Sequence, residues 1–122
     1  MKKKWRLYTK IVIDDLAKQT LINVYYFNFK YSPRNAIEFN KRILSRIHAL
    51  ETFPYIGKPI TELSNNNFRE LFFRKNKHST YRIIYYISKA QNIIYIINII
   101  SCKQNLNKFL KSNNYFKKYY NL

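Results

Sequence analysis

The spacing of apolar residues changes once along this 122-residue chain, and the change divides it into two halves. Before residue 51 apolar residues recur three and four positions apart, which is the spacing of one helix face. After residue 67 the chain is rich in Ile, Tyr and Phe, as strands are. Between the halves, the segment FPYIGKPITEL (53–63) holds the only glycine and two of the three prolines. We therefore predict an exposed crossover there, with Gly57 permitting a backbone turn that other residues resist.

Two helices are predicted in the first half. Thr9 can cap a first helix that begins just after it and continues to about Phe29. Ser32 and Pro33 fit the N-cap and first position of a second helix, because a proline there loses no hydrogen bond. The second helix should end before Phe53, so the two form an antiparallel hairpin. The expected apolar stripe of the first helix is Ile13, Leu16, Ala17, Thr20, Val24 and Phe27.

Four strands are predicted: a short one at residues 4–8, and three at residues 68–75, 80–88 and 92–102. A short helix should follow near Leu106 and run into a basic tail. The predicted fold class is α+β. A small antiparallel sheet, made of the N-terminal edge strand and the three later strands, packs on the helical hairpin in the order β-α-α-β-β-β-α. The whole chain, 1–122, is expected to be one domain, with a core at about 5–105 and a basic helix and tail at 106–122.

Alternation along residues 81–87 predicts which side chains meet the helices. Successive strand residues point to opposite faces, so Tyr81, Ile83, Tyr85 and Ile87 share one side. These apolar side chains should pack under the hairpin. Arg82 should then point to the open side of the sheet, together with Ile84 and Tyr86.

The charge predicts an anionic partner. The chain has 23 Lys and Arg against 6 Asp and Glu, a formal net charge of +17, and no acidic residue follows Glu70. Such a field attracts polyanions and speeds their capture. Nucleic acid, a ribosome, an anionic membrane and an acidic protein are the candidate partners.

The numbers of cysteines and histidines and the lengths of the apolar runs exclude several kinds of site and location. One cysteine, Cys102, excludes a disulfide within the chain and a cysteine-rich zinc site. Two histidines, His48 and His78, are too few for a typical metal centre, so we expect neither metal nor cofactor. No apolar run approaches 18 residues, and the basic start lacks the apolar segment of a secretory signal. We expect a cytoplasmic protein without a membrane partner.

Several short motifs, in this order and spacing, resemble the RelE/ParE superfamily of type II toxin–antitoxin toxins. They are IDDLAK, FPYIG, the EL at Glu62-Leu63, FREL, YRIIY and IINIISCKQN, spread over residues 5–105. The resemblance implies a small sheet backed by a helical pair. It also implies a growth-inhibiting toxin that an acidic antitoxin holds in check, in a hetero-oligomer. RelE-like members cleave mRNA in the ribosomal A site, whereas ParE-like members poison DNA gyrase.

For RNA cleavage, the resemblance implies three catalytic cations around one phosphate. They are Arg82, Arg69 and Lys103. Such a metal-independent endoribonuclease activates the 2′-hydroxyl with a base and stabilises the phosphorane with cations. We expect substitution of Arg82 or Lys103 to leave the fold intact, because both side chains should face solvent.

The remaining candidate residues are two weaker catalytic candidates and a set of candidates for RNA binding. Glu62 in the crossover and His78 in a turn are possible bases, but the histidine frequent near the last strand in this superfamily is replaced by Ser101 or Cys102. The candidate RNA-binding residues are Lys58, Arg74, Lys75, Lys77 and Tyr86, the last by stacking on a base.

Three functions remain open on the sequence alone. The high basicity favours ribosome-dependent mRNA cleavage, which is our first expectation. The long helical hairpin and PYIG are more typical of ParE-like gyrase inhibitors, and that branch needs no histidine. The third is an inactive, basic nucleic-acid-binding module.

Overall fold

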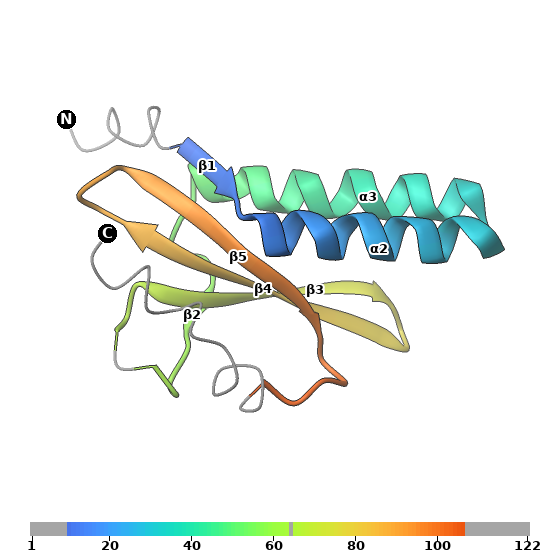
Figure 1. Cartoon of the computed structure of the whole chain (residues 1–122). Coiled ribbons are helices and arrows are strands. Elements are labelled where there is room, and N and C mark those ends of the chain that lie inside the picture. Colours follow the sequence, from blue (N-terminus) through green and yellow to red (C-terminus); the bar gives the residue numbers. More distant parts are fainter. Residues whose placement is uncertain (1–9, 64, 107–122) are drawn as a thin grey trace.

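The computed structural model describes residues 10–63 and 65–106, which form a helical hairpin on one face of a five-stranded sheet (Figure 1). The strand order is β1-β5-β4-β3-β2. The elements are β1 (Lys10–Ile13), α2 (Asp15–Tyr31), α3 (Pro33–His48), the 3-10 turn η1 (Ala49–Glu51), β2 (Lys58–Pro59), β3 (Phe68–Asn76), β4 (Ser79–Ser88) and β5 (Ile93–Ser101). The α+β class and the helix-backed sheet are therefore confirmed. The predicted C-terminal helix and the predicted strand at residues 4–8 lie outside the described residues.

The start of the first helix was predicted wrongly. The residues after Thr9 form β1, which pairs in parallel with β5, so the sheet is mixed rather than antiparallel. β-branched side chains suit this half-covered strand. The backbone N–H of Asp14 still donates to the Ile96 carbonyl at 2.9 Å, and the Asp14 carboxylate accepts from the backbone N–H of Asp15 at 2.7 Å. Asp14 therefore ends the pairing with β5 and caps α2.

The helical hairpin is as predicted at its turn. Ser32 caps α3 by accepting the backbone N–H of Asn35 at 3.2 Å, and Pro33 takes the first helical position. The buried face of α3 comprises Ala36, Phe39, Ile43 and Ile47. α2 buries only Ala17 fully, and Phe27, expected in its buried stripe, is 61% exposed. α3 therefore contributes most of the fully buried side chains of the hairpin.

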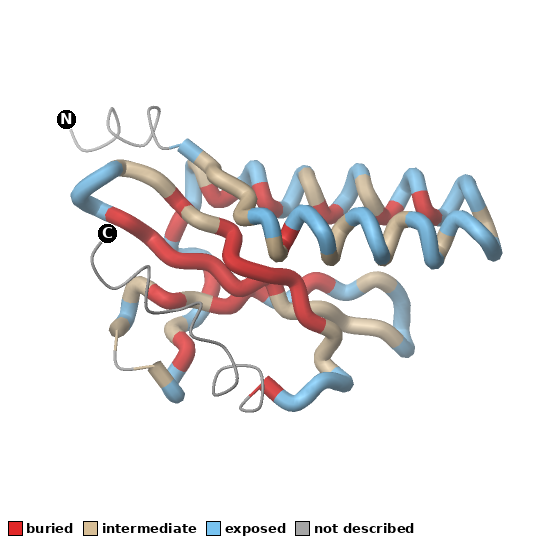
Figure 2. The backbone as a smooth tube through the Cα atoms, in the orientation of Figure 1, coloured by how far each residue is buried: buried red, intermediate tan, exposed pale blue. Residues whose placement is uncertain are grey.

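The three long strands are confirmed, and they carry apolar clusters on both faces. Under the helices, Ile83, Tyr85 and Ile87 pack with residues of α2 and α3, as the alternation predicted. The opposite face was expected to be open, but Ile84 and Tyr86 are buried there. Their neighbours in that second cluster are Phe68, Ile97, Ile100, Ile60 and Leu106. Buried positions consequently continue along most of β4 and β5 (Figure 2).

A register shift in β5 distributes its isoleucines between the two clusters. Ile84 pairs with Asn98, whereas the next residue, Tyr85, pairs with Ile96, which leaves Ile97 as an extra residue. Asn98 is buried, and its side-chain oxygen accepts from the hydroxyl of Thr20 and the backbone N–H of Ile99, each at 2.8 Å. The shift thus also creates a satisfied polar link between β5 and α2.

The crossover contains a short strand that the sequence did not predict. β2 pairs with Arg69 and Glu70 of β3 and forms one edge of the sheet. Gly57, just before it, does not have a positive φ, so the expectation of an unusual backbone turn was wrong. Glycine is needed at residue 57 because there is no room for a side chain. A Cβ there would lie 2.6 Å from the Tyr85 hydroxyl and 2.7 Å from the Glu70 carbonyl oxygen.

We expect Gly57→Ala to lower the free energy of unfolding by about 1–3 kcal/mol, the usual cost of overpacking. Urea denaturation of the purified chain measures it. Tyr85→Phe provides the control background, because it removes the closest atom that the new methyl group would meet. The cost of Gly57→Ala should be smaller in that background. An equal cost in both backgrounds would show that the hydroxyl does not restrict residue 57.

Candidate functional site

The crossover loop is held by two side chains of the sheet. The Tyr85 hydroxyl accepts the backbone N–H of Gly57 at 2.9 Å and donates to the Pro54 carbonyl at 2.8 Å. Burial raises the pKa of Tyr85 above its ordinary value of 10.0, so the hydroxyl keeps its proton at neutral pH. Arg69 donates to the Gly57 carbonyl at 2.6 Å, and its guanidinium lies 4.8 Å from the centre of the Tyr55 ring. The loop backbone is therefore fixed from the core.

This fixed loop exposes large apolar side chains. Phe53, Tyr55 and Ile56 are 58%, 42% and 54% exposed. Beside them is a hollow of about 550 Å³ that reaches the β4–β5 turn. Its lining is Pro54, Tyr55, Ile87, Ser88, Lys89, Asn92, Ile93 and Ile94. Rigid, exposed apolar side chains next to a hollow are a typical protein-binding surface.

Arg82, the first candidate catalytic cation, is paired with an acid. Its guanidinium lies 3.5 Å from the carboxylate of Glu70, whose side chain is only 6% exposed against 24% for Arg82. The Arg82 Nε is buried and has no hydrogen-bond partner among the described residues. Phe72 lies beside it, with the ring centre 5.5 Å from the guanidinium carbon. Part of the Arg82 charge is thus neutralised inside the protein.

Glu70 was not predicted to be a site residue, although the sequence contains a signal that could have identified it. It is the last acid before a long basic segment, and it sits in FREL, next to the strand that carries Arg82. Glu70 is buried because the sheet face opposite the helices is covered around the second apolar cluster. The sequence pattern predicted that this face would be open.

Arg69 does not lie beside Arg82. In the β3–β4 register, Arg69 is opposite Tyr85, which belongs to the helix-side cluster, whereas Arg82 is opposite Phe72. Directly opposed residues share a face, so the two arginines point to opposite sides of the sheet. The expected ring of three cations around one phosphate is therefore not assembled.

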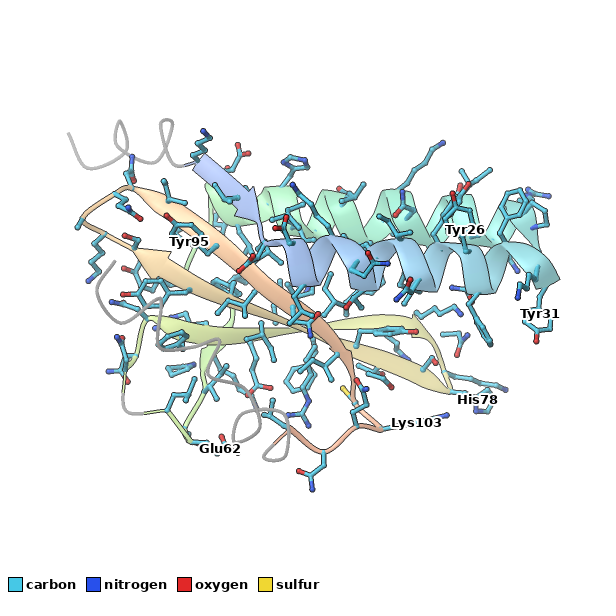
Figure 3. The ribbon with its side chains drawn as sticks, in the orientation of Figure 1. Tyr26, Tyr31, Glu62, His78, Tyr95 and Lys103 are labelled. Atoms are coloured by element: carbon cyan, nitrogen blue, oxygen red, sulfur yellow. The ribbon has the colours of Figure 1, made fainter. Side chains whose placement is uncertain are left out.

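Lys103 and His78 lie at one end of the sheet. Lys103 is exposed in the turn after β5, and His78 is exposed in the β3–β4 turn (Figure 3). Glu62 is exposed near the opposite end, where its carboxylate accepts the hydroxyl of Thr61 at 3.1 Å. The two weaker candidate bases are thus not brought together.

The candidate RNA-binding residues divide into two groups. Lys58, Arg74 and Lys77 are exposed. Tyr86 is only 3% exposed and packs against Phe68 with ring centres 4.6 Å apart, so a base cannot stack on it. Lys75 also differs from expectation, because its ammonium donates to Asn28 of α2 at 2.7 Å.

Two negative findings apply to residues 10–63 and 65–106. No three His, Cys, Asp or Glu side chains gather there in a way that would hold a metal ion. None of the helices in this part is long and apolar enough to cross a bilayer.

The helical hairpin on a five-stranded mixed sheet is consistent with the fold of RelE/ParE toxins. Residues 11–106 match the family of the ParE toxin of the type II toxin–antitoxin system parDE, and the chain belongs to that family. Membership implies a cognate antitoxin as its partner. No curated protein sequence matches the chain.

We expect Arg82→Ala to lower the free energy of unfolding by about 1–3 kcal/mol, because Glu70 would remain buried without its cation. The sequence predicted a solvent-facing Arg82, whereas its side chain is only 24% exposed, so its removal should cost stability. Lys103→Ala, at an exposed position, should change stability by no more than about 0.5 kcal/mol.

Thermal and urea denaturation of both variants measure the difference. A double-mutant cycle with Glu70→Gln and Arg82→Gln isolates the pair. A coupling energy of zero would mean that the 3.5 Å contact contributes nothing to folding.

Proposed function

We propose that this toxin stops growth by binding DNA gyrase rather than by cleaving mRNA. Gyrase inhibition is the activity that the resemblance to ParE-like toxins implies. The observation that carries the proposal is the opposite orientation of Arg69 and Arg82, because phosphorane stabilisation needs cations that converge on one phosphate. Arg69 instead holds the crossover loop, a structural role that suits a binding protein.

We assign the contact with gyrase to the crossover loop. Phe53, Tyr55 and Ile56 are exposed on a backbone that Tyr85 and Arg69 hold in place. A loop that is rigid before binding loses little conformational entropy in the complex. Aromatic side chains on such a surface are the usual anchors of protein interfaces.

We assign the contact with the antitoxin to the outer groove of the helical hairpin. Ile22, Tyr26 and Ile37 are 47%, 64% and 43% exposed and line a hollow of about 480 Å³ between α2 and α3. Lys41 lies at its edge. An acidic amphipathic segment would bury its apolar side in this groove and place its acids against the lysine.

Ribosome-dependent mRNA cleavage is the second candidate. It is favoured by the buried Nε of Arg82, which has no hydrogen-bond partner within residues 10–63 and 65–106, and by the exposed Lys103 near the same end of β5. In this mechanism Arg82 is the principal cation, and Glu70 must release it when the phosphate binds.

A direct comparison separates the two mechanisms. We expect the purified toxin to inhibit DNA supercoiling by gyrase and its expression to induce the SOS response. Primer extension on translated mRNA should reveal no new 5′ ends. Cut mRNA together with unaffected gyrase would overturn the proposal and support the second candidate.

The loop assignment has a matched control. We expect Phe53→Ser with Tyr55→Ser to weaken gyrase inhibition about tenfold or more, because two exposed aromatic anchors are lost. Phe27→Ser with Tyr31→Ser removes the same two residue types from α2, where they are 61% and 78% exposed. The control pair should retain inhibition within about twofold.

Inhibition is read as the toxin concentration that halves supercoiling, and circular dichroism verifies that both pairs are folded. If the loop pair inhibits gyrase like the unmodified toxin, the crossover loop is not the contact.

A further inference from the structure

A groove between α3 and the edge of β3 is rich in cations, and of its lining only Lys41 has a role assigned above, at the edge of the outer hairpin groove. It encloses about 720 Å³ and is lined by Lys41, Arg42, Ser45, Arg46, Ala49, Phe72, Phe73 and Arg74. Four of these eight residues are cationic and none is acidic. We propose that this groove binds the phosphate backbone of nucleic acid.

Arg42 gives the groove a fixed positive charge. Its two terminal nitrogens donate to the backbone carbonyls of Arg74 at 2.9 Å and Lys75 at 3.4 Å. Its guanidinium carbon lies 5.1 Å from the centre of the Phe73 ring. A cation held by these contacts loses little rotamer entropy when an anion approaches.

Arg42 can reach β3 because the edge of that strand is uncovered there. β2 pairs only with Arg69 and Glu70, so the strand from Leu71 onward has no partner on that side among the described residues. The carbonyls of Arg74 and Lys75 accept from α3 instead of from another strand. The same break in pairing therefore both opens the groove and anchors its central cation.

The other cations flank this anchor. Lys41 and Arg46 are exposed on α3. Arg74 is exposed on β3, where its Nε donates to the Asn76 carbonyl at 3.3 Å, so both elements contribute cations to the groove. Ser45 adds a neutral hydroxyl donor to the lining. Phosphate oxygens are the ligands that such converging arginine and lysine donors accept best.

The basic surface continues past Phe72. The Lys58 ammonium lies 5.0 Å from the centre of that ring, and the Arg82 guanidinium carbon lies 5.5 Å from it. Glu70 neutralises part of the Arg82 charge. Of the acids near the α3 wall, Glu51 lies 3.3 Å from His48, and Glu38 is exposed on α3 without lining the groove. A chain with regularly repeated charges can therefore follow the groove from α3 across the β3 edge.

The lining favours nucleic acid over an acidic peptide. A tight peptide complex needs pockets for apolar anchors, and the outer hairpin groove and the crossover loop provide such surfaces elsewhere. Ala49 and two phenylalanine rings are the only apolar residues in the lining, and Phe72 and Phe73 already contact cations. A phosphodiester chain needs no apolar pocket.

The test compares two pairs of substitutions with the same change in composition and charge. Lys41→Gln with Arg46→Gln removes two cations from the groove. Lys30→Gln with Arg34→Gln removes one exposed lysine and one exposed arginine near the hairpin turn. The comparison is needed because a protein of net charge +17 binds any polyanion to some extent.

The probes are a fluorescein-labelled 15-nucleotide oligothymidine and a 15-base-pair duplex, titrated with the purified full-length chain at several salt concentrations. We expect the groove pair to weaken binding about tenfold and to reduce the slope of log affinity against log salt by about 1–2. The hairpin-turn pair should change affinity by less than about threefold. A stronger loss for one probe identifies the strand form that the groove accepts.

Two results would overturn the proposal. Equal losses for both pairs would mean that the nucleic acid binds the general positive field and not the groove. If polyglutamate displaces the oligonucleotide from the unmodified chain at equal charge concentration but not from the groove pair, the groove binds acidic peptide instead. Because no gyrase or ribosome is present, either result leaves the proposed target unaffected.

Discussion

The phenol of Tyr85 is where the core of the sheet and the exposed crossover meet. Its ring is fully buried under the helices, and its hydroxyl contacts both Pro54 and Gly57. The alternation along β4 requires a large apolar ring at this position, whereas the loop requires a donor and an acceptor. Tyrosine supplies both. The lack of a side chain at residue 57 lets the loop approach closely, so loop geometry and core packing depend on each other.

Features that depend on neighbouring residues could be predicted from the sequence. Ser32 and Pro33 mark the helix turn by themselves, and the dense isoleucine and tyrosine segments mark the three long strands. β1 could not be predicted in the same way, because Thr9 and Asp14 both suit a helix cap and the partner strand begins at Ile93. Only long-range pairing determines that Asp14 is the cap.

In the candidate site, too, features set within one strand could be predicted, and features set by pairing between strands could not. The side on which Arg82 lies follows from alternation within one strand, and it was predicted correctly. Whether Arg69 joins it depends on the register between β3 and β4, which a single sequence does not specify. The burial of Glu70 and Tyr86 depends on segments that cross the second face of the sheet. Charge counting identified a basic protein but could not predict where helix and strand edges bring cations together.

The parallel pairing of β1 with β5 also has a consequence for how the toxin is made. Lys10 is synthesised early, but its register partner Ile93 emerges from the ribosome only after more than 80 further residues have been added. Contacts between such distant residues form late, because a long loop must close first. The helical hairpin, whose contacts are local, can form before the sheet that supports the crossover is complete. The geometry of the crossover therefore depends on a strand pairing that cannot form until Ile93 has been made.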